Sequence, residues 1–255
     1  MKILVVGTGW TGNKVFQELL NRPNINVGIV RHRDAFDVLR FYDAVINCAG
    51  VTGVPNVDAC ELDKENTMSG NAVYPILLQR ECEKYNIDFS HFSSGCIYTG
   101  MINNVDAEPN FFGSIYSLSK GISDNYLKTR ARVFRIRMPF TNIDENKNYL
   151  TKVRNYAKTA KLYDSGLNSL TDLDEAVTVA CNLVIEKSPI GAYNLVNQGS
   201  ITMRELADMM KLTPEWFTED EFAQVTRAGR STCVIPAFER MQPLEQALKK
   251  SLDIL

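Results

Sequence analysis

The sequence predicts an α/β fold, a doubly wound parallel sheet with a small C-terminal lobe. Three observations predict it: strand-like apolar runs alternate with helical periodicity over residues 1–138, a glycine-rich turn follows the first run, and the pattern loosens after Pro139. Alternating strands and helices are typical of a parallel sheet with helices on both faces. The 255 residues, 45% of them hydrophobic, can bury a large core.

Short β-branched and apolar runs predict five strands in the first part of the chain. They are Met1–Val6, Asn26–Val30, Ala44–Asn47, Ile87–Phe92 and Val133–Met138. Apolar residues at helical spacing predict helices over Asn13–Leu20, Asn71–Tyr85 and Tyr116–Lys128. Because parallel strands end at the same edge of a sheet, we expect ligands at that edge, beside Gly7, Ala49, Ser94 and Met138.

The chain after Pro139 is less regular. A polar loop (Thr141–Asn148) precedes helices at Tyr149–Lys158 and near Asp172–Ile185, and a strand follows at Ala192–Val196. We therefore expect residues 1–140 to form the first domain. Residues 141–255 are predicted to be mainly a substrate-binding lobe, with a segment of about 165–196 returning to the sheet.

Composition restricts the class of partner. The net charge of −2 argues against a nucleic-acid or anionic membrane surface, so the expected partner is a small molecule. The six cysteines form no CxxC pair, and no cluster of His, Cys and carboxylates predicts a metal site. These free thiols fit a reducing, cytoplasmic compartment. With no apolar stretch near 18 residues and a strand at the N-terminus, we expect neither a membrane span nor a secretory signal.

A glycine turn connects the first strand and helix. It reads Gly7, Thr8, Gly9, Trp10, Thr11, Gly12, a GxGxxG in the context that a dinucleotide site requires. The glycines let the backbone turn tightly and approach a pyrophosphate on the helix N-terminus. The alternative is an ordinary tight turn. We predict that residues 1–140 are a Rossmann-type dinucleotide-binding domain.

The end of the second strand predicts the dinucleotide. An NAD site would carry an acidic residue there, but the chain has Arg31 and Arg33, which suit the 2′-phosphate of NADP. The alternative is a solvated basic turn in which Asp34 pairs with either arginine. After the third strand, we expect Asn47, Ala49 and Gly50 to let the adenosine and ribose approach the backbone.

A tyrosine and a lysine predict carbonyl chemistry. Tyr116 and Lys120 are four residues apart on a predicted helix, so their side chains share one face. A nearby ammonium favours the phenolate, and Ser94 at a strand end can hold a ketone oxygen beside it. This combination suits proton delivery to a carbonyl that receives a hydride. The spacing occurs often by chance, and the glycine turn makes it informative.

Five blocks of sequence resemble the extended short-chain dehydrogenase/reductase family. Within it, they resemble the bifunctional UDP-4-keto-6-deoxyglucose 3,5-epimerase/4-reductases of UDP-L-rhamnose synthesis, a group similar to dTDP-4-dehydrorhamnose reductases. The blocks are Asn47–Glu61, Phe92–Tyr98, Glu108–Lys120, Arg135–Pro139 and Tyr149–Tyr156. The resemblance implies NADPH as cofactor, a UDP-sugar substrate and a homodimer. Gly95 and Cys96 stand where related dehydratases carry acidic residues, so dehydration is expected of a separate enzyme.

The resemblance also implies roles for individual residues. In this group, the cysteine two positions after the strand-end serine is the base and a basic residue of the following lobe is the acid, positions that match Cys96 and Lys152 here. A neighbouring cation would raise the thiolate fraction of Cys96, and Lys152, Lys120 or oxidised nicotinamide are the candidates. The alternatives are a packing thiol and a solvated lysine.

Three further residues are candidate substrate contacts. Thr52 and Asn56 lie in the most family-specific block and are expected to contact the sugar or nucleotide, unless they only shape the loop. Arg230 matches a contact to the substrate diphosphate, unless it is a surface residue.

Three functions remain open at this stage. The first is NADPH-dependent epimerisation and reduction of UDP-4-keto-6-deoxy-D-glucose to UDP-L-rhamnose. The second is 4-keto reduction alone, on a dTDP- or UDP-sugar. The third is a non-catalytic NADP-binding regulatory subunit, which the presence of Ser94, Tyr116 and Lys120 argues against.

Overall fold

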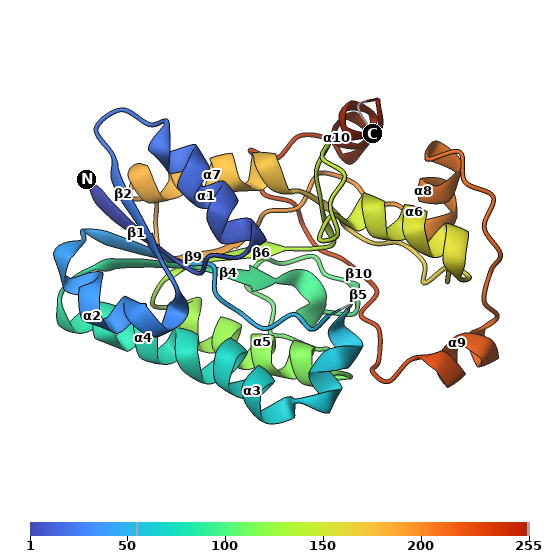
Figure 1. Cartoon of the computed structure of the whole chain (residues 1–255), viewed down its shortest axis with the longest axis horizontal. Helices are drawn as coiled ribbons and strands as arrows, with labels where there is room; N and C mark the ends of the chain where they lie inside the picture. Colours follow the sequence, from blue (N-terminus) through green and yellow to red (C-terminus); the bar gives the residue numbers. More distant parts are fainter. Residues whose placement is uncertain (55, 254–255) are drawn as a thin grey trace.

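The computed structural model describes residues 1–54 and 56–253 (Figure 1). Within them, six parallel strands form the main sheet in the order β2, β1, β3, β4, β6, β9. The strands are β1 (Lys2–Val6), β2 (Asn26–Val30), β3 (Ala44–Asn47), β4 (Asp88–Ser94), β6 (Arg132–Ile136) and β9 (Gly191–Asn194). Val6 pairs with Asn47 and Ser94 with Ile136, so the carboxyl ends of these strands are level at one edge.

Helices cover both faces of the sheet (Figure 1), which confirms the predicted doubly wound α/β fold. On one face, α1 (Trp10–Leu20) packs against α7 (Leu173–Ile185). The opposite face carries α2 (Ala35–Val38), α3 (Lys64–Met68), α4 (Tyr74–Lys84) and α5 (Ile115–Leu127). These helices place their apolar stripes on the sheet, where burial of the side chains stabilises the fold.

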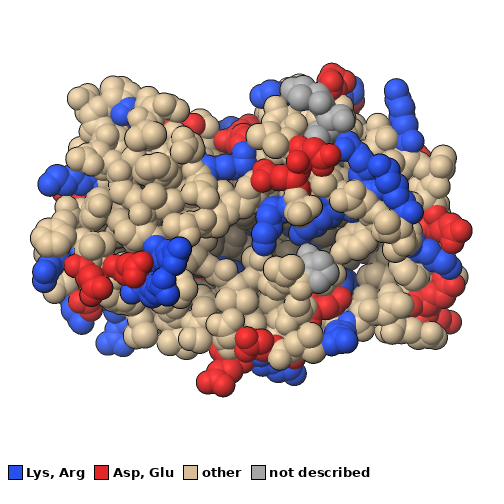
Figure 2. All heavy atoms as spheres, viewed as in Figure 1, with Lys and Arg blue, Asp and Glu red and all other residues tan. Residues whose placement is uncertain are grey.

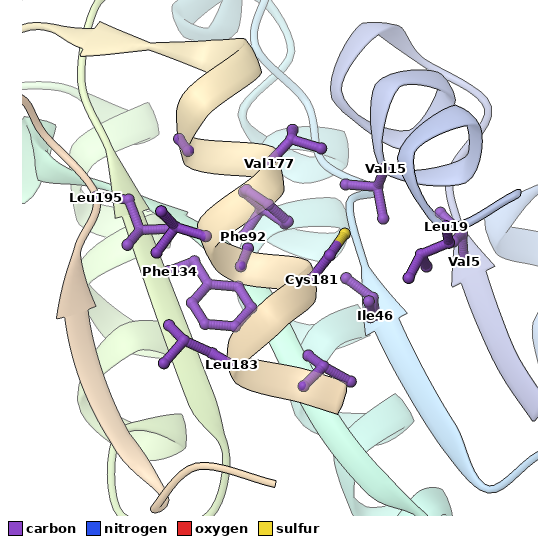
Figure 3. Close-up of a cluster of buried hydrophobic side chains, with 14 of the residues drawn as sticks. Val5, Val15, Leu19, Ile46, Phe92, Phe134, Val177, Cys181, Leu183 and Leu195 are labelled. Carbon is purple, nitrogen blue, oxygen red and sulfur yellow. The ribbon is translucent and has the colours of Figure 1, made fainter. Parts of the chain in front are cut away.

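The core between the sheet and α7 is built from aliphatic and aromatic side chains (Figure 3). Phe92 of β4 and Phe134 of β6 meet edge to face with ring centroids 5.4 Å apart. Val177, Cys181 and Leu183 of α7 cover them from above the sheet. A second apolar cluster lies under α4 and α5, so the sheet is buried on both faces, as parallel sheets are.

The helix predicted over Asn71–Tyr85 is longer and less regular in the structure. It begins as α3, continues through a π-helical turn at Ser69–Val73, and becomes α4 at Tyr74. The π turn adds a residue to the turn, and such turns occur often at functional sites. The strands β2 and β3 have the predicted bounds.

The later part of the chain forms a second core. α6 (Tyr149–Thr159), α8 (Met203–Met209) and α10 (Leu244–Leu252) contribute buried leucines to it. The remaining short elements are β5 (Gly100–Met101), β7 (Pro139–Phe140), β8 (Thr171–Asp172), α9 (Glu219–Val225) and β10 (Cys233–Val234). Two elements of this later part belong to the main sheet: α7 packs on its face, and β9 is its last strand, paired with β6. The division into a cofactor domain and a substrate lobe stays a prediction.

Exposed apolar residues lie on the outer helices. Val73, at the end of the π turn, and Leu77 of α4 are about half exposed, and Ile122 of α5 is 41% exposed. The homodimer stays a prediction. Of the helices that the structure describes, none combines the length and apolar character needed to cross a bilayer.

Candidate active site

The structure gives a different reason for glycine at each of the three positions of the turn that follows β1. Gly7 has φ +108°, and a Cβ on it would lie 2.8 Å from the Ala49 nitrogen. A Cβ on Gly12 would lie 1.8 Å from the Gly7 oxygen, so close packing of helix on strand requires glycine there. A Cβ on Gly9, the N-cap of α1, would meet nothing within 4 Å. The space over the helix N-terminus is therefore open, and the turn fits a pyrophosphate.

Trp10 and Thr11 begin α1 beside this turn. The Trp10 indole Nε1 donates to Glu145 Oε1 at 2.5 Å. This bond ties the glycine turn to the loop after β7. The first turn of α1 holds no acidic residue that would repel a phosphate.

The segment after β3 and the π-helical turn meet beside Lys120. Asn47 is fully buried, and its Oδ1 accepts from the Ala49 backbone nitrogen at 3.0 Å. A Cβ on Gly50 would lie 3.0 Å from both Lys120 Nζ and Asn71 Oδ1. Glycine at this position therefore leaves room for the lysine. The fully buried Asn71 in the π turn was missed by the sequence reasoning, because a polar residue within a helical pattern gives no distinctive signal.

Arg31 and Arg33 follow β2 and are both exposed. Arg33 Nε lies 3.7 Å from Asp34 Oδ1, a solvent-exposed ion pair that contributes little. The turn itself is held by Tyr74, whose hydroxyl donates to the His32 oxygen at 2.6 Å. Both exposed arginines are therefore carried by a fixed backbone at the carboxyl end of β2.

Helix α5 presents Tyr116 and Lys120 to the same edge. Its first turn is fixed by Ser114 Oγ, which accepts from the Ser117 nitrogen at 3.1 Å, and by Glu61 Oε1, which accepts from the Ile115 nitrogen at 2.6 Å. Glu61 ends the family-specific block quoted above, and it was not predicted to act on this helix. Through its hydrogen bond to the Ile115 nitrogen, this block helps to fix the start of the helix that carries Tyr116.

Burial dominates the titration of this pair. It raises the pKa of Tyr116, Cys96 raises it further, and the Ser94 hydroxyl acts against this. The direction differs from the one expected from the lysine alone, because Tyr116 is only 9% exposed. Burial also lowers the pKa of Lys120 to about 8, although Asp124 one turn later opposes the shift. Tyr116 is thus held as the protonated acid.

Replacing Lys120 with Met is expected to raise the free energy of unfolding of the cofactor-free protein at pH 7 by about 3 kcal/mol. Burial lowers the pKa of Lys120 from 10.5 to about 8, so below pH 8 the folded state holds a buried charge that the unfolded chain solvates. Between about pH 8 and 10.5 the folded state loses this proton first, and wild-type stability rises. Urea unfolding should show that the difference in free energy of unfolding between the variant and the wild type is smaller at pH 10 than at pH 7. A Lys120→Met protein less stable than the wild type at pH 7 would contradict this expectation.

Ser94 and Cys96 lie together at the end of β4. Ser94 Oγ accepts from the Cys96 nitrogen at 3.1 Å, and Ser94 is buried. Cys96 Sγ accepts from Arg137 Nη1 at 3.4 Å, and it lies close enough to Tyr116 to act on the pKa of that phenol. The structure therefore brings Ser94, Cys96 and Tyr116 together. Arg137, the cation nearest the sulfur, was not among the predicted site residues.

Lys152 lies on α6, a helix of the second core that approaches this group. Burial, with Lys147 nearby, lowers the pKa of Lys152. One turn earlier on the helix, Tyr149 lies within the influence of both Arg137 and Cys96, and burial raises its pKa to about 12. The helix thus approaches the sulfur, while no hydrogen bond joins Lys152 to Cys96 within the described residues.

The predicted substrate contacts lie on two loops that the structure joins. Arg230 forms a bidentate ion pair with Asp58, at 2.8 and 2.6 Å. Asn56 Oδ1 accepts from the Asp58 nitrogen at 2.9 Å, and its Nδ2 donates to the Tyr156 hydroxyl at 3.4 Å. Thr52 is exposed. Arg230 and Asn56 therefore belong to one structured region, with Arg230 already paired to a carboxylate.

The face drawn in Figure 2 is hollowed near its middle, and Lys and Arg side chains border the hollow. A separate hollow of about 950 Å³ lies at the amino ends of the strands, lined in part by Met1, Asp43, Asp88 and Lys187. Ser94, Cys96, Tyr116 and the glycine turn lie at the carboxyl ends of the strands, so this second hollow is at the opposite edge of the sheet from the predicted site. Among residues 1–54 and 56–253, no group of three or more His, Cys, Asp or Glu side chains is arranged to hold a metal ion.

Sequence comparison finds a family match and curated relatives. The NAD dependent epimerase/dehydratase family model matches residues 3–155. A trifunctional UDP-glucose 4,6-dehydratase/UDP-4-keto-6-deoxy-D-glucose 3,5-epimerase/UDP-4-keto-L-rhamnose-reductase of Arabidopsis thaliana is 30% identical over 257 residues, 91% of this chain and 38% of that protein. The chain thus spans less than two fifths of that relative. A bifunctional dTDP-4-dehydrorhamnose 3,5-epimerase/dTDP-4-dehydrorhamnose reductase of Arabidopsis thaliana is 30% identical over 230 residues, 81% of this chain and 75% of that protein.

Solved structures share the fold. A UDP-rhamnose synthase from Acanthamoeba polyphaga mimivirus superimposes with a TM-score of 0.88 at 23% identity, covering 100% of this chain and 99% of that one. A dTDP-4-dehydrorhamnose reductase from Bacillus anthracis in complex with NADP gives a TM-score of 0.77 at 16% identity, covering 99% and 97%.

Proposed function

Because this chain belongs to the NAD-dependent epimerase/dehydratase family, we propose that it epimerises UDP-4-keto-6-deoxy-D-glucose at C3 and C5 and reduces the 4-keto group with NADPH, forming UDP-L-rhamnose. The family predicted from the five sequence blocks is confirmed by this match. The observation that supports the proposal is the meeting of Cys96 with Ser94 and Tyr116 at one sheet edge. One group of neighbouring side chains would then supply both a base for epimerisation and an acid for reduction.

The ketone explains why both activities fit one site. A carbonyl at C4 acidifies the protons on C3 and C5, so a single substrate group makes both epimerisations accessible. Cys96 would take a proton from one face of the sugar, and Lys152 would return one from the other face. Ser94 and Tyr116 would hold the enolate oxygen between these steps. The lowered pKa of Lys152 favours release of its proton.

The residues present fit NADPH. Gly7 and Gly12 let the turn and helix α1 pack closely, Gly9 leaves space for a pyrophosphate at the start of α1, and Arg31 and Arg33 would hold the 2′-phosphate. When bound, NADPH supplies the hydride for C4. Tyr116, kept protonated by burial, would donate its proton to the C4 oxygen, and Lys120 would orient the cofactor ribose and the phenol.

Mixing the protein with UDP-4-keto-6-deoxy-D-glucose and NADPH in D₂O tests the proposal. NMR of the product should show UDP-L-rhamnose with deuterium at C3 and C5. A 6-deoxy sugar without rhamnose stereochemistry would favour the reductase-only alternative. NADPH binding without oxidation, on UDP- and dTDP-linked ketones alike, would favour the regulatory-subunit alternative. The homodimer and the cytoplasmic location are part of the same proposal.

Replacing Arg31 and Arg33 together with Ala is expected to weaken NADPH binding by about 1–3 kcal/mol and to change NADH binding little. The lost interaction is the charged contact to the 2′-phosphate, which NADH lacks. Fluorescence titration of both cofactors measures the difference. Arg40→Ala, which removes another exposed arginine, is the matched control. An equal loss for NADPH and NADH would indicate damage to the turn.

A further inference from the structure

Arg137 is a buried arginine without a carboxylate partner among the described residues. Its exposed fraction is 1%, and it directly follows β6. The two other buried arginines of this strand are neutralised: Arg132 by Asp88 at 2.7 Å, and Arg135 by Asp124 at 2.6 Å. Buried charges are normally paired, because an uncompensated charge is costly away from water. The Arg137 guanidinium therefore lacks its counter-ion.

The contacts of Arg137 identify the group that can supply the negative charge. Its Nη1 donates to Ser231 Oγ at 2.9 Å and its Nη2 to the Ser231 oxygen at 2.8 Å, while Nη2 also donates to Asn168 Oδ1. These partners are neutral and cannot ionise near pH 7. The remaining contact, from Nη1 to Cys96 Sγ at 3.4 Å, is to a thiol, a group that carries a negative charge once it loses its proton.

The backbone fixes this contact from both sides. A Cβ on Gly95 would lie 3.4 Å from Arg137 Cβ, so the loop that carries Cys96 packs directly on the arginine. The Arg137 nitrogen donates to Thr171 Oγ1 at 2.9 Å, and Met138 after it has φ +43°, a left-handed conformation uncommon for a residue other than glycine. Such a conformation persists only where the surroundings determine it. The backbone around Arg137 is thus fixed, and the guanidinium is held beside Cys96.

We propose that Arg137 is a positioning residue that holds Cys96 as the thiolate, and so keeps the base of the epimerisation ready. This inference rests on the proposed function. In the proton-transfer step, the C–H bond at C5 or C3 breaks, its electron pair moves to form the enolate, and the proton bonds to the sulfur. Lys152 returns a proton to the carbon on the opposite face, and the ketone re-forms. Arg137 stays charged throughout, and Cys96 Sγ is its contact among the groups that take part in the proton transfer.

Arg137 thereby separates two tasks that the sequence assigned to Lys152 or Lys120. A cation that activates the thiol need not also donate a proton, because a guanidinium does not lose one in proteins. Lys152 remains available as the acid. The other titratable groups facing the sulfur are Tyr116 on α5, Tyr149 on α6 and Cys233 on β10, and burial raises the pKa of each. At pH 7 these three are therefore neutral.

Alkylation of Cys96 in the free enzyme tests the inference without substrate. Iodoacetamide labelling at pH 7, read by peptide mass spectrometry, should be at least 10-fold slower in Arg137→Met than in wild type, because an ordinary cysteine is only a few per cent thiolate at that pH. Arg137→Lys, which keeps a charge, should label faster than Arg137→Met. Lys152→Met should label within about twofold of wild type. Equal rates in wild type and Arg137→Met, or a loss found in Lys152→Met instead, would overturn the inference.

A second measurement covers the case in which Arg137→Met does not fold. The absorbance spectrum of Cys96→Ser is subtracted from that of the wild-type protein at pH 7, which leaves the thiolate absorbance of Cys96 near 240 nm. This difference should correspond to a thiolate fraction well above the few per cent expected of an ordinary thiol. A thiolate fraction of only a few per cent would overturn the inference. If the labelling rate of Cys96 depends on Arg137 but the wild-type protein forms no rhamnose, the proposed function is wrong while the inference about Arg137 stands. NADPH affinity reports whether each variant is folded.

Discussion

Replacing Tyr116 with Phe is expected to lower the rate of ketone reduction by at least about 10²-fold while leaving the affinity for NADPH nearly unchanged. The substitution removes the proton donor and keeps the aromatic ring, which is 9% exposed and packed in place. Stopped-flow or steady-state oxidation of NADPH with the 4-keto sugar measures the rate, and fluorescence titration measures the affinity.

Tyr126→Phe is the matched control for this variant. Tyr126 lies near the other end of α5, away from the strand ends, and the change of side chain is the same. Its turnover should equal that of the wild type. Near wild-type turnover of Tyr116→Phe on a verified substrate would remove Tyr116 from the proposed site.

Replacing Cys96 with Ser should block epimerisation and preserve reduction. Serine is close to cysteine in size but far less acidic, so the variant tests proton transfer more than packing. Deuterium uptake from D₂O at C3 and C5 should stop. Hydride transfer from NADPH to the unepimerised ketone should continue, because Ser94, Tyr116 and Lys120 are unchanged. The product is then a 6-deoxy sugar without rhamnose stereochemistry. NMR of the product distinguishes the two activities in one sample.

Cys82→Ser provides the same chemical change away from the site. Cys82 is buried on α4 in the cluster under the sheet, so its loss affects packing only. That variant should still exchange deuterium and form rhamnose. Unchanged rhamnose formation by Cys96→Ser would exclude Cys96 from the mechanism and favour reduction alone.

The strands and the glycine turn could be predicted from the sequence because local patterns specify them. The β-branched runs ending at Val30 and Asn47 are strands with the bounds expected, and Gly7 and Gly12 stand where backbone packing requires glycine. Local signals also existed for α8 and α9, which were not predicted. Each begins with a capping box, Thr202 with Glu205 and Thr218 with Glu221.

The contacts that complete the site could not be predicted in this way. Arg137 and Cys96 are 41 residues apart, and Arg230 and Asp58 are 172 apart. Whether an arginine is neutralised depends on tertiary packing, as Arg135 and Arg137 show: they lie two residues apart, one paired with Asp124 and the other not. A pattern of residue types contains no such information.

The position of β9 affects how the chain acquires its structure during synthesis. Residues 191–194 complete the sheet beside β6, and α7 covers Phe92 and Phe134 only once the chain has been made as far as Ile185. Until then, the nascent chain exposes an unpaired strand edge and one apolar face of its sheet, features that favour aggregation. A fragment ending at residue 140 would keep the glycine turn but lack α7 and β9, so we expect residues 1–140 not to fold as an independent unit.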